Sequence, residues 1–305
     1  MRVVFMGTPS FAVPSLRALA SVFDVALVVT RPDAVRSRGK VLEPSPVKEA
    51  ALELGLTVLE ATKMTPEVLD ELRGVHADVF CVAAYGCILP DEVLAMAPGG
   101  CVNVHASLLP RWRGAAPIQR CILEGDAETG VSIMRIGHGV DTGDYCAQAA
   151  CGVSGKTADE LTAELASLGG DLLVRVLPSV VDGTVAWTEQ DESLVTHAAK
   201  ISKQEMKLDS SLDAQSNVRR VFASSDAAPA RCQVAGKPLR VLSAAPADEK
   251  VEPGRFAISG KRLLLGCADG SFEVLEVKPD GKRAMPAPAW TAGQRDSSGE
   301  WGLLQ

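Results

Sequence analysis

The chain of 305 residues contains no apolar run that approaches the length of a membrane span, for which ~20 consecutive apolar residues are needed. Its N-terminal apolar stretch, Val3–Met6, stops at a Gly-Thr-Pro turn, whereas the apolar core of a secretory signal peptide is longer. The eight cysteines form no Cys-x-x-Cys pair and have no histidine at ligand spacing, so we expect no metal site and no disulfide framework. These absences predict a cytoplasmic protein with reduced cysteines and no membrane association.

The sequence also lacks the Gly-x-Gly-x-x-Gly pattern that binds a dinucleotide after the first strand of many α/β proteins. The turn that follows Val3–Met6 reads Gly7-Thr8-Pro9, with a proline where a pyrophosphate-binding loop needs free amides. We therefore expect a Rossmann-like topology without a bound dinucleotide.

An excess of positive charge is absent as well, since the net charge is -7. This argues against indiscriminate binding to nucleic acid, which needs clustered cations. Residues 209–305 are closer to balance, with 13 Lys and Arg against 12 Asp and Glu, whereas residues 1–208 hold 18 against 26. Any contact with RNA must therefore depend on local basic patches.

Short apolar runs typical of buried strands alternate with helical patterns in the first half of the chain, which predicts an α/β fold with a mostly parallel, Rossmann-like sheet. The expected strands are Val3–Met6, Val25–Thr30, Thr57–Leu59, Val79–Ala83 and Cys101–Val104, and helices are expected after Pro14 and over Val47–Leu54 and Pro66–Arg73. After Pro229, short alternating runs separated by Gly and Pro predict a small, OB-like β-barrel; the runs are Leu239–Leu242, Arg262–Gly266 and Ser271–Val277. We therefore expect two domains, residues 1–190 and 209–305, joined by a linker over residues 191–208.

Three polar residues form a candidate catalytic group. Asn103 and His105 are two residues apart at the end of a predicted strand, so their side chains point to the same face of the sheet. Asp141 follows later in a glycine-flanked turn. An amide can stabilise an oxyanion, an imidazole can carry a proton and a carboxylate can hold the imidazole. Together they suit transfer of an acyl group without a covalent enzyme intermediate.

The motifs around these residues resemble those of the 10-formyltetrahydrofolate-dependent formyltransferases. The resemblance is carried by Asn103–Pro110 and by Asp141–Gly143. A narrower likeness, to the branch that formylates initiator Met-tRNA, lies in Arg111–Arg120, Phe5–Pro9, Ala84–Pro90 and Gly125–Gly130. These motifs fall within residues 1–190, and the last third of the chain matches only weakly.

The resemblance implies an enzyme of the formyltransferase fold, with 10-formyltetrahydrofolate as donor and initiator Met-tRNA as the RNA partner, and we expect a monomer. Asn103, His105 and Asp141 match the catalytic trio of the family. Asn103 would stabilise the formyl oxygen, and His105 would take the proton of the attacking amine or protonate the leaving folate nitrogen. Asp141 would favour the imidazolium or order a water between donor and acceptor.

The resemblance also implies a folate site built from two loops that follow predicted strands. Its expected residues are Ser107, Leu108, Leu109, Pro110, Tyr85, Gly86 and Ile88. The leucines and the proline offer an apolar wall for a flat pterin, and the glycine lets the backbone approach closely. An ordinary buried loop is the alternative for the leucine-containing segment.

The expected tRNA contacts come from two basic segments and are Arg36, Arg38, Lys40, Arg111 and Arg113. The first three belong to a long loop bounded by prolines, which corresponds to the family's insertion at the tRNA acceptor end. The other two flank an aromatic residue, an arrangement that suits stacking and phosphate contact. A solvated charged loop, and a segment with Trp112 packed inward, are the alternatives.

The C-terminal third departs from the family pattern. Ser210-Ser211 stands where a tryptophan is expected, and Ser224–Pro229 replaces an aromatic segment, so the RNA contacts of this domain stay open. Three rival functions stay open too: a formyltransferase for a smaller amine, an RNA-binding protein without the chemistry, and a formyltetrahydrofolate hydrolase. The intact trio argues against the pure binder, and the basic loop would have no role in the hydrolase.

Overall fold

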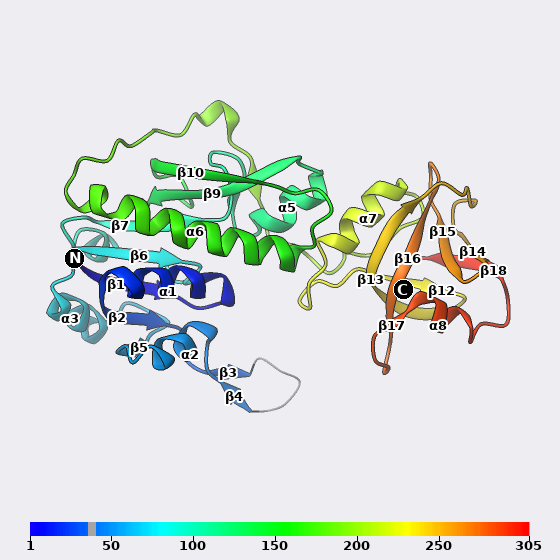
Figure 1. Ribbon diagram of the computed structural model, residues 1–305, viewed down its shortest axis with the longest axis horizontal. Coiled ribbons are helices and arrows are strands. Elements are labelled where there is room, and N and C mark those ends of the chain that lie inside the picture. The colour runs from blue at the N-terminus through cyan, green and yellow to red at the C-terminus, as the bar shows by residue number, and fades with distance from the viewer. Residues whose placement is uncertain (36–40, 305) are drawn as a thin grey trace. The chain divides into compact units, whose positions relative to one another are not determined.

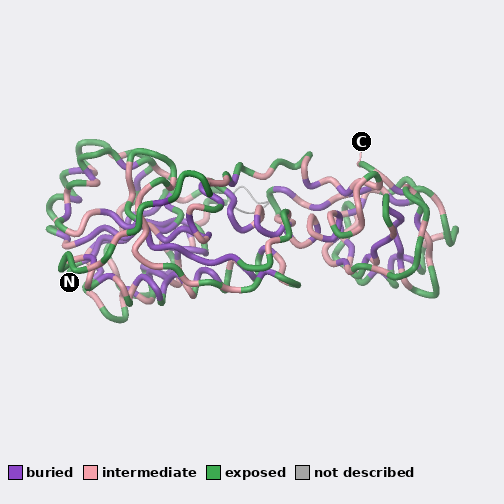
Figure 2. The backbone as a smooth tube through the Cα atoms, turned by 90° about the horizontal axis from the view of Figure 1, so that it is seen from above, coloured by how far each residue is buried: buried purple, intermediate pink, exposed green. Residues whose placement is uncertain are grey.

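The computed structural model describes residues 1–35 and 41–304 (Figure 1). Contacts divide the chain into two compact units. The N-terminal unit comprises Met1–Pro117, Glu128–Gly152 and Thr162–Ala198, and the C-terminal unit comprises Ile118–Ala127, Val153–Leu161 and Ala199–Gln305. Buried residues follow the strands inside each unit, whereas the loops carry most of the exposed residues (Figure 2). Each unit therefore has a core of its own.

The N-terminal unit is built around a seven-stranded sheet in the order β10-β9-β7-β6-β1-β2-β5. Its strands are β1 (Arg2–Gly7), β2 (Asp24–Thr30), β5 (Val58–Glu60), β6 (Val79–Ala83), β7 (Cys101–His105), β9 (Glu128–Arg135) and β10 (Tyr145–Gly152). The neighbours from β7 to β5 are parallel, whereas β9 pairs antiparallel with both β7 and β10. The predicted mostly parallel, Rossmann-like sheet is therefore confirmed.

Helices cover both faces of this sheet. They are α1 (Val13–Val22), α2 (Pro46–Glu53), α3 (Pro66–Val75), α4 (Asp91–Leu94) and α6 (Ala158–Val181). On one face, α6 approaches α1 so closely that a Cβ on Gly170 would lie 3.1 Å from Pro14. On the other face, Leu69 of α3 and Met6 of β1 belong to the same buried cluster. With both faces covered, the central strands are apolar without alternation.

Several short elements lie before the C-terminal barrel in the sequence. They are the 3-10 turns η1 (Ser10–Ala12) and η2 (Glu192–Leu194), the strands β3 (Ala34–Val35), β4 (Leu42–Glu43), β8 (Arg113–Gly114) and β11 (His197–Ala198), and α5 (Pro117–Glu124). β8 and β11 pair in parallel, with Arg113 opposite His197 and Gly114 opposite Ala198. This pairing fixes the chain that follows residues 107–110, which we call the leucine-containing loop.

The C-terminal unit contains a closed antiparallel barrel. Its six strands are β12 (Arg231–Val234), β13 (Lys237–Ala247), β14 (Arg255–Ser259), β15 (Arg262–Gly266), β16 (Ser271–Pro279) and β18 (Ser298–Gly302). The order β13-β12-β18-β14-β15-β16 returns to its start because β13 also pairs with β16, and closure removes open strand edges. The short β17 (Met285–Pro286) pairs with β16, and α7 (Ala214–Phe222) and α8 (Ala287–Thr291) contribute to the same core. The predicted small β-barrel is confirmed.

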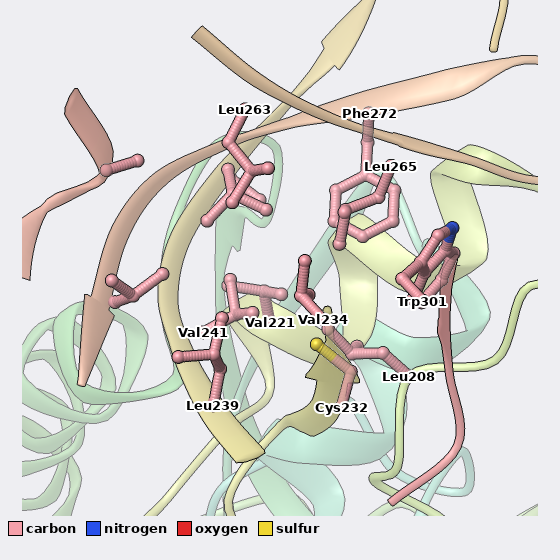
Figure 3. Packing of buried hydrophobic residues seen from close by; sticks show 14 of the residues in the cluster. Leu208, Val221, Cys232, Val234, Leu239, Val241, Leu263, Leu265, Phe272 and Trp301 are labelled. Atoms are coloured by element: carbon pink, nitrogen blue, oxygen red, sulfur yellow. The ribbon is translucent and has the colours of Figure 1, made fainter. Parts of the chain in front are cut away.

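Side chains from all six barrel strands fill the interior of the barrel (Figure 3). Phe272 and Trp301 meet edge to face with ring centroids 5.8 Å apart, an arrangement that aromatic pairs favour. The indole Nε1 of Trp301 donates a hydrogen bond of 2.9 Å to the carbonyl of Gly266, so its one polar atom is satisfied. Burial raises the pKa of Cys232 to about 12, which keeps this thiol neutral in the core.

We predict that Phe272→Ala lowers the free energy of unfolding by about 3–5 kcal/mol, because it leaves a cavity in a closed core. Urea unfolding followed by tryptophan fluorescence measures the loss. Leu275→Ala on the same strand is the matched control, because Leu275 is 41% exposed, and we expect it to change stability by about 0.5 kcal/mol or less. Equal losses for the two variants would contradict this description of the barrel core.

Candidate active site

β7 brings Asn103 and His105 to the carboxyl end of the sheet. Asn103 lies opposite Val82 of β6 and Met134 of β9, and His105 lies opposite Ser132. In open α/β sheets, ligands bind outside the carboxyl ends of the strands. The Asn103 side chain is half-buried, and within residues 1–35 and 41–304 its amide has no hydrogen-bond partner. Its donors are therefore available to a ligand.

The two ring nitrogens of His105 face different acceptors. The imidazole is 6% exposed, and its Nε2 lies 3.0 Å from the carbonyl oxygen of Trp112. Because a carbonyl only accepts, Nε2 carries the hydrogen of this bond. Nδ1 lies 3.5 Å from Oδ2 of Asp141, which is longer than a hydrogen bond. In the neutral ring, Nδ1 therefore keeps a lone pair and faces a carboxylate.

Asp141 is held in a conformation that few residues adopt. Its φ of 54° lies in the left-handed region, which aspartate tolerates better than most residues with a Cβ but which still costs energy. Its side chain is 18% exposed, and Oδ2 accepts a hydrogen bond of 2.9 Å from the backbone N–H of Gly114. The structure thus brings the three predicted catalytic residues together, two on one strand and one from the glycine-flanked turn.

This geometry suits proton transfer next to an amide donor. A proton taken up at Nδ1 of His105 would lie beside the Asp141 carboxylate, which favours the resulting imidazolium. The Trp112 carbonyl holds the opposite side of the ring, so that the imidazole is kept in one orientation. Asn103, on the same face two residues earlier, presents N–H donors to a developing oxyanion.

The loop after β7 is tied to the sheet by the side chains of Ser132 and Gln148. Oγ of Ser132 accepts from the N–H of Leu109 at 3.0 Å and donates to the carbonyl of Ser107 at 2.7 Å. The amide of Gln148 donates to the Leu109 carbonyl at 2.8 Å. Ser107 and Leu109 are buried, whereas Leu108 and Pro110 are partly exposed. The predicted folate loop is thus fixed, with two of its four residues open to a ligand.

The second predicted folate segment follows β6. Tyr85 is 2% exposed and its hydroxyl donates to the carbonyl of Ala61 at 2.9 Å, while its own carbonyl accepts from Thr8 at 3.1 Å. Gly86 has a φ of 77°, a conformation that glycine adopts without strain. Ile88 is 94% exposed. The tyrosine therefore supports the segment from inside, whereas the other two residues lie at the surface.

The predicted tRNA-binding residues differ in exposure, and three of them lie outside the part of the chain that the structure describes. Arg36, Arg38 and Lys40 lie outside the described residues. Arg111 is exposed, and its guanidinium carbon lies 4.5 Å from the centre of the Trp112 ring. Arg113 is 4% exposed, and Trp112 is packed inward, as the alternative interpretation of this segment anticipated.

Sequence reasoning missed the residues that contact the Arg113 side chain. Its Nε donates to Oε1 of Gln190 at 2.9 Å, and its Nη2 lies 2.8 Å from Oε1 of Glu192. The hydrogen bond from Arg113 lowers the pKa of the Glu192 carboxyl. Both partners fall near the predicted linker, where no motif pointed to the site. Ser132 and Gln148, which hold the leucine-containing loop, were also missed, because no motif includes them.

The described residues contain neither a metal-ligand cluster nor a membrane-spanning helix. Among residues 1–35 and 41–304, no group of three or more His, Cys, Asp or Glu side chains is arranged to hold a metal ion. No helix in this part of the chain is both long enough and apolar enough to span a membrane.

Comparison with known proteins identifies relatives over the whole chain. Residues 1–177 match the family described as Formyl transferase, and residues 200–295 match the Formyl transferase C-terminal domain. The methionyl-tRNA formyltransferase of Methylococcus capsulatus is 45% identical over 292 residues, which cover 94% of this chain and 95% of that protein. The methionyl-tRNA formyltransferase of Neisseria meningitidis serogroup B is 41% identical over 305 residues, covering 98% and 99% of the two chains.

Solved structures share the fold at lower identity. An N-formyltransferase from Helicobacter canadensis, solved with folinic acid and dTDP-3-aminofucose, has a TM-score of 0.68 at 17% identity over 89% of this chain and 98% of that chain. HypX from Aquifex aeolicus, solved with tetrahydrofolic acid, has a TM-score of 0.64 at 18% identity over 96% of this chain and 47% of that chain. With two formyl transferase domains and full-length relatives above 40% identity, this chain belongs to the formyl transferase family of enzymes, among the methionyl-tRNA formyltransferases.

Proposed function

We propose that this enzyme transfers the formyl group of 10-formyltetrahydrofolate to the free α-amino group of initiator methionyl-tRNA. The observation that carries the proposal is the grouping of Asn103, His105 and Asp141 at the carboxyl end of β7. The full-length relatives named methionyl-tRNA formyltransferase support the choice of acceptor. The neighbours solved with folinic acid and tetrahydrofolic acid support a folate donor.

In the proposed reaction, the amine nitrogen attacks the formyl carbon as a free base. A new C–N bond forms, and the electron pair of the formyl C=O bond moves to oxygen. We assign stabilisation of this oxyanion to the amide of Asn103, whose donors have no partner among the described residues. Such a donor acts mainly on the transition state, because the charge that it contacts develops there.

His105 moves the proton that the reaction must relocate. Nδ1 takes one proton from the attacking nitrogen, directly or through a water, and Asp141 at 3.5 Å stabilises the imidazolium. The same proton then passes to the folate nitrogen as its C–N bond to the formyl carbon breaks. The products are tetrahydrofolate and the formylated amine, and the enzyme returns to its initial protonation state.

We propose that the folate lies against the loops after β6 and β7. Leu108, Pro110 and Ile88 offer partly or fully exposed apolar surface, which suits one face of a pterin. Gly86 would allow the ring to approach the backbone. The buried Ser107, Leu109 and Tyr85 would then shape the site from beneath. We expect the donor to bind without a metal ion.

For the RNA, we propose contacts from the basic loop that contains Arg36, Arg38 and Lys40, and from Arg111. Arg111 is supported by its exposure and by its position over the Trp112 ring, which suits stacking at the rim of a site. We expect these cations to give binding that weakens with salt. Arg113 is not included, because its guanidinium is buried against Gln190 and Glu192.

We also propose that the enzyme works as a monomer in the cytoplasm. All three proposed catalytic side chains come from one chain, so no second copy is needed to complete the group. The eight cysteines are free, as is usual in proteins of reducing compartments.

A comparison of acceptors tests the proposal. The enzyme is incubated with 10-formyltetrahydrofolate labelled in the formyl group and with one acceptor at a time: initiator Met-tRNA, Met-tRNA acetylated on its amine, an amino-sugar nucleotide, glycinamide ribonucleotide or water alone. We expect label on initiator Met-tRNA and none on the acetylated form. Label on a small amine alone, or formate alone, would instead support a small-amine formyltransferase or a hydrolase.

A further inference from the structure

Arg113 and Gln190 form a buried polar pair that the formyl-transfer steps do not use directly. Arg113 is 4% exposed and Gln190 is 5% exposed. A guanidinium in such a setting must be paired, because burying an unpaired charge is costly. Arg113 meets this need with its Nε on Gln190 and its two terminal nitrogens on Glu192, at 3.3 and 2.8 Å. Each of the three guanidinium nitrogens of Arg113 therefore donates a hydrogen bond.

Gln190 connects this pair to the turn that carries Asp141. Its Nε2 lies 2.9 Å from the carbonyl oxygen of Asp141 and 2.6 Å from that of Gly143. An amide nitrogen has two hydrogens, so one can go to each carbonyl. Its Oε1 accepts from Arg113, which determines the end of the amide that faces the turn. The Gln190 amide therefore bridges the two sides of the turn, and we call Gln190 together with Arg113 the clamp.

Asp141 depends on such support more than most residues do. Its φ of 54° lies in the left-handed region, which costs energy even for aspartate, so the contacts around the turn stabilise this conformation. The carboxylate is fixed separately by the N–H of Gly114, next to Arg113 in β8. Arg113 thus lies between the two contacts: its side chain orders the backbone of Asp141 through Gln190, and its neighbour holds the carboxylate.

The clamp is itself anchored at both ends. Thr188, two residues before Gln190, exchanges backbone hydrogen bonds of 3.1 and 2.9 Å with Tyr145, which follows the turn. The backbone N–H of Arg113 donates to the carbonyl of Thr196 at 2.9 Å. The amide of Gln190 is therefore placed by strand-like pairing and not by a free loop.

We propose that Gln190 and Arg113 are positioning residues that set the Asp141 carboxylate against His105. The proposal rests on the proposed function in one respect, since it assumes that Asp141 acts with His105 in formyl transfer. It gives Arg113 a role different from the RNA contact that its sequence setting predicts.

The first test is Gln190→Met, which keeps the length of the side chain and its burial but removes both donors. Because small displacements in an active site cost up to about a hundredfold in rate, we expect kcat to fall about tenfold to a hundredfold. KM for folate and for Met-tRNA should stay within about twofold, because no substrate contact is lost. In an Asp141→Asn background the same change should lower kcat by less than about twofold. Full additivity of the two losses would overturn the proposal.

The second test is Arg113→Lys, which retains the charge but not the planar fork. A positioning role predicts a fall in kcat comparable to that of Gln190→Met, with the salt dependence of tRNA binding unchanged. If Arg113 instead contacts a phosphate, lysine should largely preserve kcat, and an Arg113→Met variant should reduce the salt slope by about one unit. That result would overturn the proposal.

The third measurement does not depend on activity. The Gly114 amide is bonded to Asp141, so its hydrogen exchange reports the position of the carboxylate. We expect Gln190→Met to accelerate exchange at Gly114 about tenfold or more, with the amides of β1 unchanged as a check on global stability. Gln148→Met is the matched control, because its amide holds the leucine-containing loop. It should change KM for folate and leave Gly114 unaffected.

The exchange measurement separates failure of this inference from failure of the proposed function. If the parent enzyme formylates no Met-tRNA but Gly114 exchange rises in Gln190→Met, the acceptor is wrong and the clamp stands. If the parent enzyme formylates Met-tRNA and Gly114 exchange is the same in both proteins, the clamp is wrong.

Discussion

His105→Ala should lower kcat for formyl transfer to Met-tRNA by about a hundredfold to ten thousandfold, the usual contribution of a general acid–base. The structure supplies the reason. One nitrogen of the ring is tied to the Trp112 carbonyl, and the other faces the Asp141 carboxylate at 3.5 Å. Alanine removes the group that carries the proton from the amine to the folate nitrogen. Single-turnover transfer of labelled formyl at saturating substrate measures the loss.

The control for this variant is another histidine. His76 is exposed and ends α3 with a φ of 52°, a conformation that asparagine tolerates well. His76→Asn should therefore leave kcat within about twofold of the parent. A parent-like rate in His105→Ala, with the protein folded, would show that another group moves the proton.

Asn103→Ala should lower kcat by about a hundredfold to a thousandfold, the effect measured when one oxyanion donor is removed. Asn103→Asp should be at least as damaging, because it replaces the donor with a negative charge of similar shape next to the developing oxyanion. Both variants should leave KM for Met-tRNA nearly unchanged, since the contact strengthens only in the transition state. A rise in KM with unchanged kcat would instead assign Asn103 to substrate binding.

Asn217 provides the comparison for Asn103. It is fully buried in the C-terminal unit, where its amide donates to the carbonyl of Asp209 at 2.8 Å and its carbonyl accepts from the Asp209 N–H at 2.9 Å. Asn217→Ala should lower the free energy of unfolding by about 1–3 kcal/mol, because it leaves buried backbone groups unpaired. It should not lower kcat of the folded enzyme. The two asparagines thus separate a loss of stability from a loss of catalysis.

The central sheet and the barrel were predictable because their strands have strong local signals. Apolar runs such as Val79–Ala83 indicated buried parallel strands, and Arg262–Gly266 and Ser271–Val277 indicated short barrel strands; all lie within observed strands. β10 gave no such signal, because its exposed residues Gln148, Ala150 and Gly152 alternate with half-buried alanine and cysteine and not with large apolar side chains. α6 contains Pro178 within its 24 residues, and an internal proline argues against a helix in a sequence.

Spacing along a strand predicted one part of the candidate site, and the family resemblance predicted the rest of the catalytic group. The two-residue interval between Asn103 and His105 on a strand is enough to place both on one face. The contact between His105 and Asp141 depends on how a distant turn folds, and no periodicity encodes it. The same applies to Gln190, which is buried far from any motif. Arg113 differs from expectation in its burial, since Arg111 and Trp112 beside it suggested an exposed side chain and the structure buries it.

The most direct test of this account is the single-turnover rate of formyl transfer to initiator Met-tRNA in the parent, in His105→Ala and in Asn103→Ala/His105→Ala. The account predicts rapid transfer by the parent. Because groups that act as a unit are not additive, the double variant should fall within about tenfold of His105→Ala. No formyl-Met-tRNA from the parent, or transfer by the double variant at the parent rate, would contradict the account.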